Sequence, residues 1–440
     1  MKKNTLIVLA LIAFFLAVGC FSSDDDNQDD YSNDDTTTTT AASCSANPAW
    51  FNTPMTEPRY DTFPGSSATN CDFHQISWQY FLWLTEAVGN GELRFETMFN
   101  SEAIDPNYPD STSHVLGGIV QAGGPAGILI DQKGRAVYTT LLINDIYRDF
   151  VIENNLYTVE GMKAVPDSLD FPPGAFSLKA SWKIVEEGED VSKFYTTTAE
   201  VKVLKQENGK IVLTEETKQE QVALVGFHIA VVVEHHPEFI WATFEHVDNA
   251  PNLDADANMN APVSNKDYTF YKAGTLPGDC NQFNASIVSL DAATQKMTPV
   301  TQVFRQYRNG GGDSTNNSNI DSLNASVHSM LAAGSVWKNY REVGAVWFNT
   351  ANGVLVPNWT PNNDPQDRIT GSTKVSNATI ETFTQNIRSE HECFSCHNTL
   401  AVTNTFEPDK SLAGKNVLTS HILLQNYLDL VGGERINRVE

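Results

Sequence analysis

Cys393, Cys396 and His397 form the most chemically specific pattern in the sequence, Cys-Phe-Ser-Cys-His. Two thiols separated by two residues can add to the two vinyl groups at one edge of a porphyrin, and the adjacent imidazole can then ligate the iron. The chain has 6 cysteines and 10 histidines among 440 residues, so the pattern is rare by chance. It predicts one covalent c-type haem, attached at Cys393 and Cys396, with His397 as an axial ligand of the iron.

Two other chemistries use the same residues. Thiolate and imidazole are both zinc ligands. The first alternative is therefore a tetrahedral zinc site formed by His391, Cys393, Cys396 and His397. The second alternative is that Cys393 and Cys396 alone form a redox-active dithiol, although no thioredoxin-like βαβ pattern surrounds them. The export signal described below favours haem, because c-type haem is attached outside the cytoplasm.

The second axial ligand of this haem is assigned by elimination to His421. No methionine follows Met330, which excludes the downstream methionine of small cytochromes c. His421 is the one histidine after the motif, and it lies near the start of a helix expected over 418–431. A helix-surface histidine is the alternative role for His421. The sixth position of the iron could instead be filled by Met297, Met330 or an upstream histidine, or it could be open.

The N-terminus has the pattern of a lipoprotein signal peptide over residues 1–19. Two lysines precede an apolar stretch over 6–18, which is too short to span a bilayer as a mature helix. The stretch ends in Leu-Ala-Val-Gly-Cys, which resembles the bacterial lipobox and predicts lipidation of Cys20. An ordinary signal peptide with an unmodified cysteine is the alternative.

Residues 20–43 are predicted to be a disordered tether, because they hold a run of aspartates and five consecutive threonines and few apolar residues. Within the tether, the acidic stretch 23–26 resembles the export signal of surface lipoproteins in the Bacteroidetes. The protein is therefore expected in the cell envelope, as an outer-membrane lipoprotein held by its lipid anchor. Exposure on the cell surface is a further expectation.

The composition allows a folded body and excludes one class of partner. Hydrophobic residues make up 41% and aromatic residues 10% of the chain, which is enough for a core. The formal net charge is −25, and an acidic surface repels the phosphate backbone, so nucleic acid is not an expected partner. A redox partner protein of unspecified identity is expected instead.

Periodicity predicts an α+β protein with an antiparallel, sheet-rich body. A buried helix is expected over 72–88, where apolar residues leave little polar face. Strands are expected over 176–185, 194–204, 221–233 and 239–246, with tight turns at 131–134, 208–209 and 235–238. Further helices are expected over 376–390 and 418–431. These elements divide the chain into a body over 44–370 and a helical haem-binding segment over 371–440.

The remaining histidines and cysteines are given structural roles. His74 lies in the first expected helix, where a core histidine is the favoured interpretation over a ligand. His228 and His246 are expected to face each other across one hairpin, again with a structural role favoured over metal or haem binding. Outside the motif and Cys20, three cysteines allow one disulfide, and Cys44–Cys71 closes the shortest loop.

Three stretches together resemble a group of secreted bacterial proteins known as monohaem cytochrome c family proteins. They are residues 127–134, residues 224–229 with 241–249, and residues 393–399. The resemblance implies the haem site, and only this motif carries a functional meaning that the resemblance transfers. Electron transfer at the cell envelope is the leading function, rather than an enzymic reaction. Two alternatives stay open: a peroxidase-like oxidoreductase with an open iron site, and a surface binding module in which the haem is structural.

Overall fold

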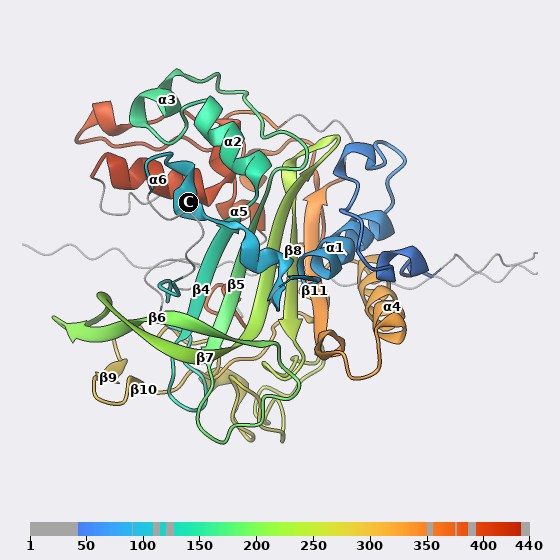
Figure 1. Ribbon diagram of the computed structural model, residues 1–440, viewed down its shortest axis with the longest axis vertical. Coiled ribbons are helices and arrows are strands. Elements are labelled where there is room, and N and C mark those ends of the chain that lie inside the picture. The colour runs from blue at the N-terminus through green and yellow to red at the C-terminus, as the bar shows by residue number, and fades with distance from the viewer. Residues whose placement is uncertain are drawn as a thin grey trace, which may run out of the picture. The chain divides into compact units, whose positions relative to one another are not determined.

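An antiparallel sheet lies at the centre of the computed structural model, which describes residues 43–89, 91–108, 115–119, 127–349, 355–374, 376–385 and 393–432 (Figure 1). In the described residues the sheet has eight strands in the order β12-β11-β8-β7-β5-β4-β3, with β6 paired to β7 beside this path. Its strands are β3 (Phe99–Asn100), β4 (Val137–Ile143), β5 (Phe176–Ile184), β6 (Thr196–Glu207), β7 (Lys210–Val233), β8 (His236–His246), β11 (Tyr340–Phe348) and β12 (Ile369–Gly371).

Two small hairpins and the helices complete the architecture. The hairpins are β1 (Ala87–Gly89) with β2 (Glu92–Leu93), and β9 (Ser289–Asp291) with β10 (Lys296–Thr298). The helices are α1 (Asn70–Leu84), α2 (Asp145–Glu153), α3 (Val159–Ala164), α4 (Ser314–Met330), α5 (Cys393–Cys396) and α6 (His421–Leu430). Short 3-10 helices span Pro48–Phe51, Tyr60–Thr62, Arg94–Thr97, Ser101–Ile104, Pro277–Asp279, Arg308–Gly310, Val336–Asn339, Pro361–Asn363, Pro408–Lys410 and Asn416–Thr419. The predicted α+β class is confirmed.

The strand predictions are largely confirmed because the apolar patterns are long. The second half of β7 is buried and lies between β5 and β8, as its nearly continuous apolar run indicates for a central strand. Its first half is mostly exposed and pairs with β6 alone. The turn at Asn208–Gly209 joins these two strands, with both residues at positive φ.

The first face of the sheet is covered by α1 and α4. Core side chains of α1, including Phe73, Trp78 and Phe81, pack with those of β5, β7, β8 and β11. The predicted buried helix is thus confirmed, but it ends at Leu84 rather than at residue 88. The Thr85 hydroxyl donates to the carbonyl of Phe81 at 2.7 Å, which occupies a carbonyl at the end of the helix before the chain turns into β1.

The second face of the same sheet is covered by other elements. At one end, Ile143, Ala230 and Val232 pack with apolar residues of α2, α3 and α6. The helix expected over 418–431 is confirmed as α6, which begins at His421 after the 3-10 helix Asn416–Thr419. In the middle of this face, the side chains of Lys179, His228, Thr243 and Trp241 are half-buried.

The helix predicted over 376–390 is wrong for its described part. Residues 376–385 form bends and turns over the second face, and residues 386–390 lie outside the described residues. In a helix the backbone groups of this segment would bond to one another, but here they bond to side chains. The Asn377 carbonyl accepts a hydrogen bond from Gln385 Nε2, and the Ala378 N–H donates to Glu245 Oε1 at 2.6 Å.

The predicted pairing of His228 with His246 is also wrong. His228 pairs with Thr243, and His246 pairs with Tyr340 of β11. The turn between β7 and β8 comes earlier than expected, because Val233 already pairs with His236. A register irregularity between Val231 and Val233 shifts the partners back by two residues, which is not enough to bring His246 opposite His228.

The roles predicted for the remaining cysteines and His74 are confirmed. A disulfide joins Cys44 and Cys71. His74 is fully buried, and its ring nitrogens bond to Glu342 Oε1 at 2.6 Å and to Asn316 Oδ1 at 2.9 Å. All described residues belong to one compact unit, Ser43–Glu440, whereas the predicted signal peptide, Cys20 and almost all of the tether lie outside the described residues.

Candidate functional site

The Cys-Phe-Ser-Cys-His motif is held by its phenylalanine. Residues Cys393–Cys396 make the single turn α5, and the His397 N–H donates to the Cys393 carbonyl at 2.8 Å. Phe394 is fully buried, with its ring centroid 5.0 Å from that of Phe348 and 5.6 Å from that of Trp359. The turn therefore directs one apolar side chain into the core, while Cys393 stays half-buried and Cys396 exposed.

The residues after the motif fix it to the segment before β12. Thr399 Oγ1 donates to the Val356 carbonyl at 2.6 Å and accepts from the Trp359 N–H at 2.8 Å. The Asn398 side-chain amide donates to the Ser395 carbonyl at 2.9 Å, back across the turn. The residues that follow the motif are thereby positioned by hydrogen bonds rather than by a long helix.

The tautomer of His397 follows from its hydrogen bond. His397 Nδ1 lies 2.9 Å from the carbonyl oxygen of Thr419. A carbonyl only accepts, so Nδ1 carries the proton, and Nε2 is the nitrogen that a neutral imidazole offers to a metal. This is the arrangement that orients histidine ligands in metalloproteins, where a carbonyl beyond the ligand fixes the plane of the ring.

The His397 ring lies between two other aromatic rings. Its centroid is 3.8 Å from that of Trp241, with an interplanar angle of 32°, and 3.8 Å from that of His421, with an angle of 23°. His421 Nε2 lies 3.0 Å from the Cys396 carbonyl and donates to it. The structure thus brings together Cys396, His397 and His421, which the sequence singled out, and adds Trp241 from β8.

The second axial ligand stays a prediction. Two imidazoles that ligate one iron lie on opposite faces of the porphyrin, with their nitrogens roughly 4 Å apart for metal–nitrogen bonds of about 2 Å. His397 and His421 instead stack nearly parallel, and His421 Nε2 bonds to a backbone carbonyl. Ligation by His421 therefore requires the two rings to separate.

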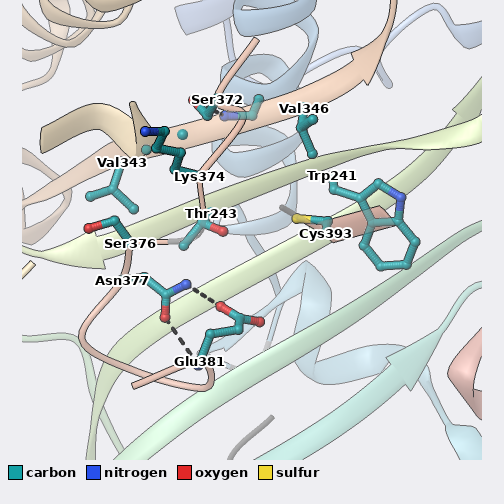
Figure 2. Close-up of a pocket in the computed structure, with 13 residues that line it drawn as sticks. Trp241, Thr243, Val343, Val346, Ser372, Lys374, Ser376, Asn377, Glu381 and Cys393 are labelled. Carbon is teal, nitrogen blue, oxygen red and sulfur yellow. Dashed lines mark hydrogen bonds between the residues drawn. The ribbon is translucent and has the colours of Figure 1, made fainter. Parts of the chain in front are cut away.

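A solvent-open pocket begins beside Cys393 (Figure 2). Its walls include apolar groups of β8 and β11, and its polar rim comes mostly from the irregular segment after β12. The lining residues are Trp241, Thr243, Gly310, Val343, Gly344, Ala345, Val346, Ser372, Lys374, Ser376, Asn377, Glu381 and Cys393. The pocket thus lies between the Cys-Phe-Ser-Cys-His motif and the second face of the sheet.

Glu381 and His228 are polar residues of this region that were not predicted to form a site. Glu381 fell within a predicted helix, and His228 was given a structural role. Glu381 Oε1 lies 3.2 Å from His228 Nδ1, and both side chains are about one-fifth exposed, at 20% and 17%. Lys179, next to His228 in register, has a lowered pKa because burial disfavours its charged form, while the charge of Glu381 opposes the shift.

Other metal chemistry finds no support in the described ranges. Among these residues, no group of three or more His, Cys, Asp or Glu side chains could hold a metal ion. The zinc alternative includes His391, which lies outside the described residues, as does Cys20. In the part of the chain that the structure describes, no helix has the length and apolar character needed to cross a membrane.

Comparison with known proteins gives no match. No protein family, no curated protein and no solved structure matches the chain. Function is therefore inferred from the residues of the site and from the resemblance of its motifs.

Proposed function

We propose that the protein is an electron-transfer lipoprotein of the cell envelope that carries one c-type haem. The haem is attached through Cys393 and Cys396 and ligated by His397. The observation that carries this proposal is the hydrogen bond from His397 Nδ1 to the Thr419 carbonyl, which presents Nε2 as the coordinating nitrogen. The two thiols support it, because neither is sequestered in the core.

The residues around the motif fit such a group. A bound haem supplies reversible one-electron chemistry. Trp241 and Val346 offer apolar surface beside Cys393, while Lys374 and Asn377 offer donors at the polar rim that suit carboxylates. In this proposal residues 371–440 form the haem-binding segment, with α5 holding the thiols and α6 beginning at His421. The acidic chain favours a basic redox partner, because complementary charge accelerates encounter.

Covalent attachment is tested by producing the protein with a cytochrome c maturation system. Haem should remain with the chain through acid and organic extraction and give a c-type pyridine haemochrome. Replacing Cys393 and Cys396 by alanine should abolish the signal, whereas Cys280→Ala, at a buried thiol away from the motif, should retain it. Purified wild type that contains zinc and lacks haem would refute the proposal.

The lipid anchor is tested separately from the haem. Cys20→Ala should release the protein from the membrane fraction, because the acyl chains are lost. Deletion of residues 23–26 should leave the protein in membranes but reduce its cleavage by external protease. A Cys20→Ala protein that fractionates as wild type does is incompatible with the lipobox assignment.

The spin state of the iron separates electron transfer from the second candidate, an oxidoreductase with an open iron site. The stacking of His421 on His397 is the observation that favours this second candidate. A low-spin spectrum that becomes high-spin in His421→Ala would assign His421 as the sixth ligand and support electron transfer. A wild-type spectrum that is already high-spin supports the open site.

A further inference from the structure

Ionisable and polar side chains from two neighbouring strands meet in the middle of the second face. Lys179 and Ser181 of β5 lie opposite His228 and Gly226 of β7 in the antiparallel register. Residues that lie opposite each other, or two apart on one strand, share a face of the sheet. Phe227 packs in the core under the first face, so its neighbours His228 and Gly226 face the other way, with Lys179 and Ser181 beside them.

The irregular segment 376–385 lies over these positions. A Cβ on Gly226 would collide with Thr379 Oγ1, so this hydroxyl lies directly above the glycine. Glu381 Oε1, from the same segment, lies 3.2 Å from His228 Nδ1. Two strands and the segment above them thus contribute to one group of residues, which we call the Lys179 site: Lys179, Ser181, His228, Thr379 and Glu381.

Three buried atoms of the Lys179 site have no hydrogen-bond partner among the described residues. They are Ser181 Oγ, His228 Nε2 and Thr379 Oγ1. The side chains of Ser181 and Thr379 are fully buried. Folded proteins pair nearly all buried polar groups, because an unpaired group loses its hydrogen bonds to water without replacement. Three such atoms at neighbouring positions therefore indicate a site that a polar ligand completes.

Lys179 supplies an amine to this site. Its side chain is half-buried, and no carboxylate in the described part of the chain lies within ion-pair distance of its ammonium. Burial lowers the pKa of Lys179 because it disfavours the charged form, while the charge of Glu381 opposes the shift. The neutral amine, which is the nucleophilic form, is therefore more populated at Lys179 than at an exposed lysine.

His228 offers a proton acceptor beside this amine. Its Nδ1 faces the Glu381 carboxylate, which accepts, so Nδ1 donates and the buried Nε2 of the neutral ring keeps a lone pair. Glu381 is itself held by Asn377, whose side-chain amide donates to its Oε2 and whose Oδ1 accepts from its N–H at 3.2 Å (Figure 2). Because Glu381 also lines the solvent-open pocket, a small molecule can approach the Lys179 site from there.

We propose that Lys179 is a nucleophile that condenses with a small aldehyde, that His228 carries the protons, and that the hydroxyls of Ser181 and Thr379 bind the carbonyl oxygen. The amine nitrogen attacks the carbonyl carbon, a C–N bond forms, and the electron pair of the C=O bond moves to the oxygen. His228 Nε2 then passes the two N–H protons, one after the other, to that oxygen, which leaves as water. A C=N imine remains, nothing is oxidised or reduced, and Glu381 is the positioning residue of His228.

Acetaldehyde with sodium cyanoborohydride is the probe, because the borohydride transfers hydride to the imine and converts it to a stable ethylamine. Peptide mass spectrometry of the purified protein then gives a rate constant for each lysine at pH 7. Lys179 should react about 100-fold faster than Lys272, whose side chain is 65% exposed, because general acid–base catalysis acts on Lys179 alone. In urea-unfolded protein the two rate constants should become equal. Equal rate constants in the folded protein, or no adduct at Lys179, would overturn the proposal.

Variants of the histidine and the carboxylate test the proton transfer. His228→Asn should lower the rate constant at Lys179 about 100-fold, the lower range of general acid–base effects. Glu381→Gln has a diagnostic sign: loss of a charge alone would lower the pKa of Lys179 further and raise the rate constant, whereas loss of a positioning residue lowers it. Glu381→Asp should recover part of that loss. The matched control Glu407→Gln removes an exposed carboxylate paired with Lys410 and should change nothing, and a faster Glu381→Gln reaction would overturn the role of Glu381.

Thr379→Ala separates the reaction from folding. It should lower the rate constant at Lys179, because the carbonyl oxygen loses a donor. It should leave the urea midpoint close to that of wild type, because Thr379 Oγ1 has no hydrogen-bond partner among the described residues. Ser181→Ala should lower the rate constant in the same way, and wild-type rate constants in both variants would overturn the proposed binding of the oxygen. The adduct is read by mass and the haem by its pyridine haemochrome, so either assignment can fail without the other.

Discussion

The two faces of the central sheet use the same strands and are covered in different ways. On the first face, Phe227 and Phe244 pack under the regular helices α1 and α4. On the second face, His228 and Thr243, their neighbours in sequence, lie half-buried near the irregular segment 376–385. A helix satisfies its own backbone and can cover an apolar surface, whereas an irregular segment leaves backbone and side chains to bond with polar groups beneath it. The middle of the second face therefore differs from the first face in holding ionisable side chains under an irregular segment, although one end of it also packs on helices.

Truncation of one tryptophan on each face should give the largest contrast. Trp78→Ala on α1 should lower the free energy of unfolding by about 3–5 kcal/mol, because a fully buried ring is lost. The ring also donates to Asn324 Oδ1, which would lose its partner. Trp241→Ala removes a half-buried ring and should lower the free energy of unfolding by about 1–2 kcal/mol. Urea unfolding measures both.

Equal losses in these two variants would contradict the comparison. If the proposed haem is bound, Trp241→Ala should also change its absorption spectrum, because the ring contacts His397, whereas Trp78→Ala should not.

The contact between the second face and segment 376–385 offers the next test. A Cβ on Gly226 would lie 2.0 Å from Thr379 Oγ1, so Gly226→Ala should lower the free energy of unfolding by about 1–3 kcal/mol. Thr379→Ala should be nearly neutral, because its buried hydroxyl has no hydrogen-bond partner.

The double variant Gly226→Ala with Thr379→Ala should recover most of the stability that Gly226→Ala loses. A double-mutant cycle from urea unfolding measures this coupling. Strictly additive effects would show that the segment does not pack on the sheet as described.

The sequence predicts the first face better than the second. The helix α1 and the central half of β7 carry long apolar patterns, and each was assigned correctly in type. In segment 376–385, Ile380 and Phe383 are buried as their spacing indicates, but Ile380 has a φ of 72° and the segment is not helical. Its conformation depends on bonds to Glu245, which lies far away in the sequence.

The candidate site divides in the same way. Cys393, Cys396 and His397 are adjacent in the sequence and could be identified from their spacing. The stacking of Trp241 on His397 and the pairing of Glu381 with His228 join distant segments, so no local pattern records them. Only the tertiary fold brings each pair together and places Trp241 and Glu381 on the wall of one pocket.

Acidification should destabilise the protein through the buried His246. Burial disfavours the charged imidazole and lowers the pKa of His246 to about 4, against an ordinary value near 6.5. Between these values the unfolded chain binds a proton that the folded chain does not. The free energy of unfolding therefore falls as pH drops through this window, by about 2 kcal/mol at pH 5.

His246→Gln should make the difference in stability between pH 7 and pH 5 smaller by that amount. Asp131 contributes an opposite slope, because burial raises its pKa to about 6, so each variant is compared with wild type at both pH values. An unchanged pH dependence in urea unfolding of His246→Gln would show that the imidazole does not titrate as assigned.

The caps of one helix on each face give the smallest and most local contrast. Ser420 caps α6, and its hydroxyl accepts from the Leu423 N–H and bonds to the buried Tyr147 hydroxyl. Ser420→Ala should lower the free energy of unfolding by about 1–2 kcal/mol, because the Tyr147 hydroxyl also loses a partner. Thr69 at the start of α1 donates to Asp72 at 2.6 Å in an exposed position, so Thr69→Ala should cost about 0.5 kcal/mol.

In holoprotein, only Ser420→Ala should also perturb the haem spectrum, because α6 begins with His421. A spectrum unchanged in Ser420→Ala, together with equal losses of stability, would show that the start of α6 is no more coupled to the haem motif than the start of α1.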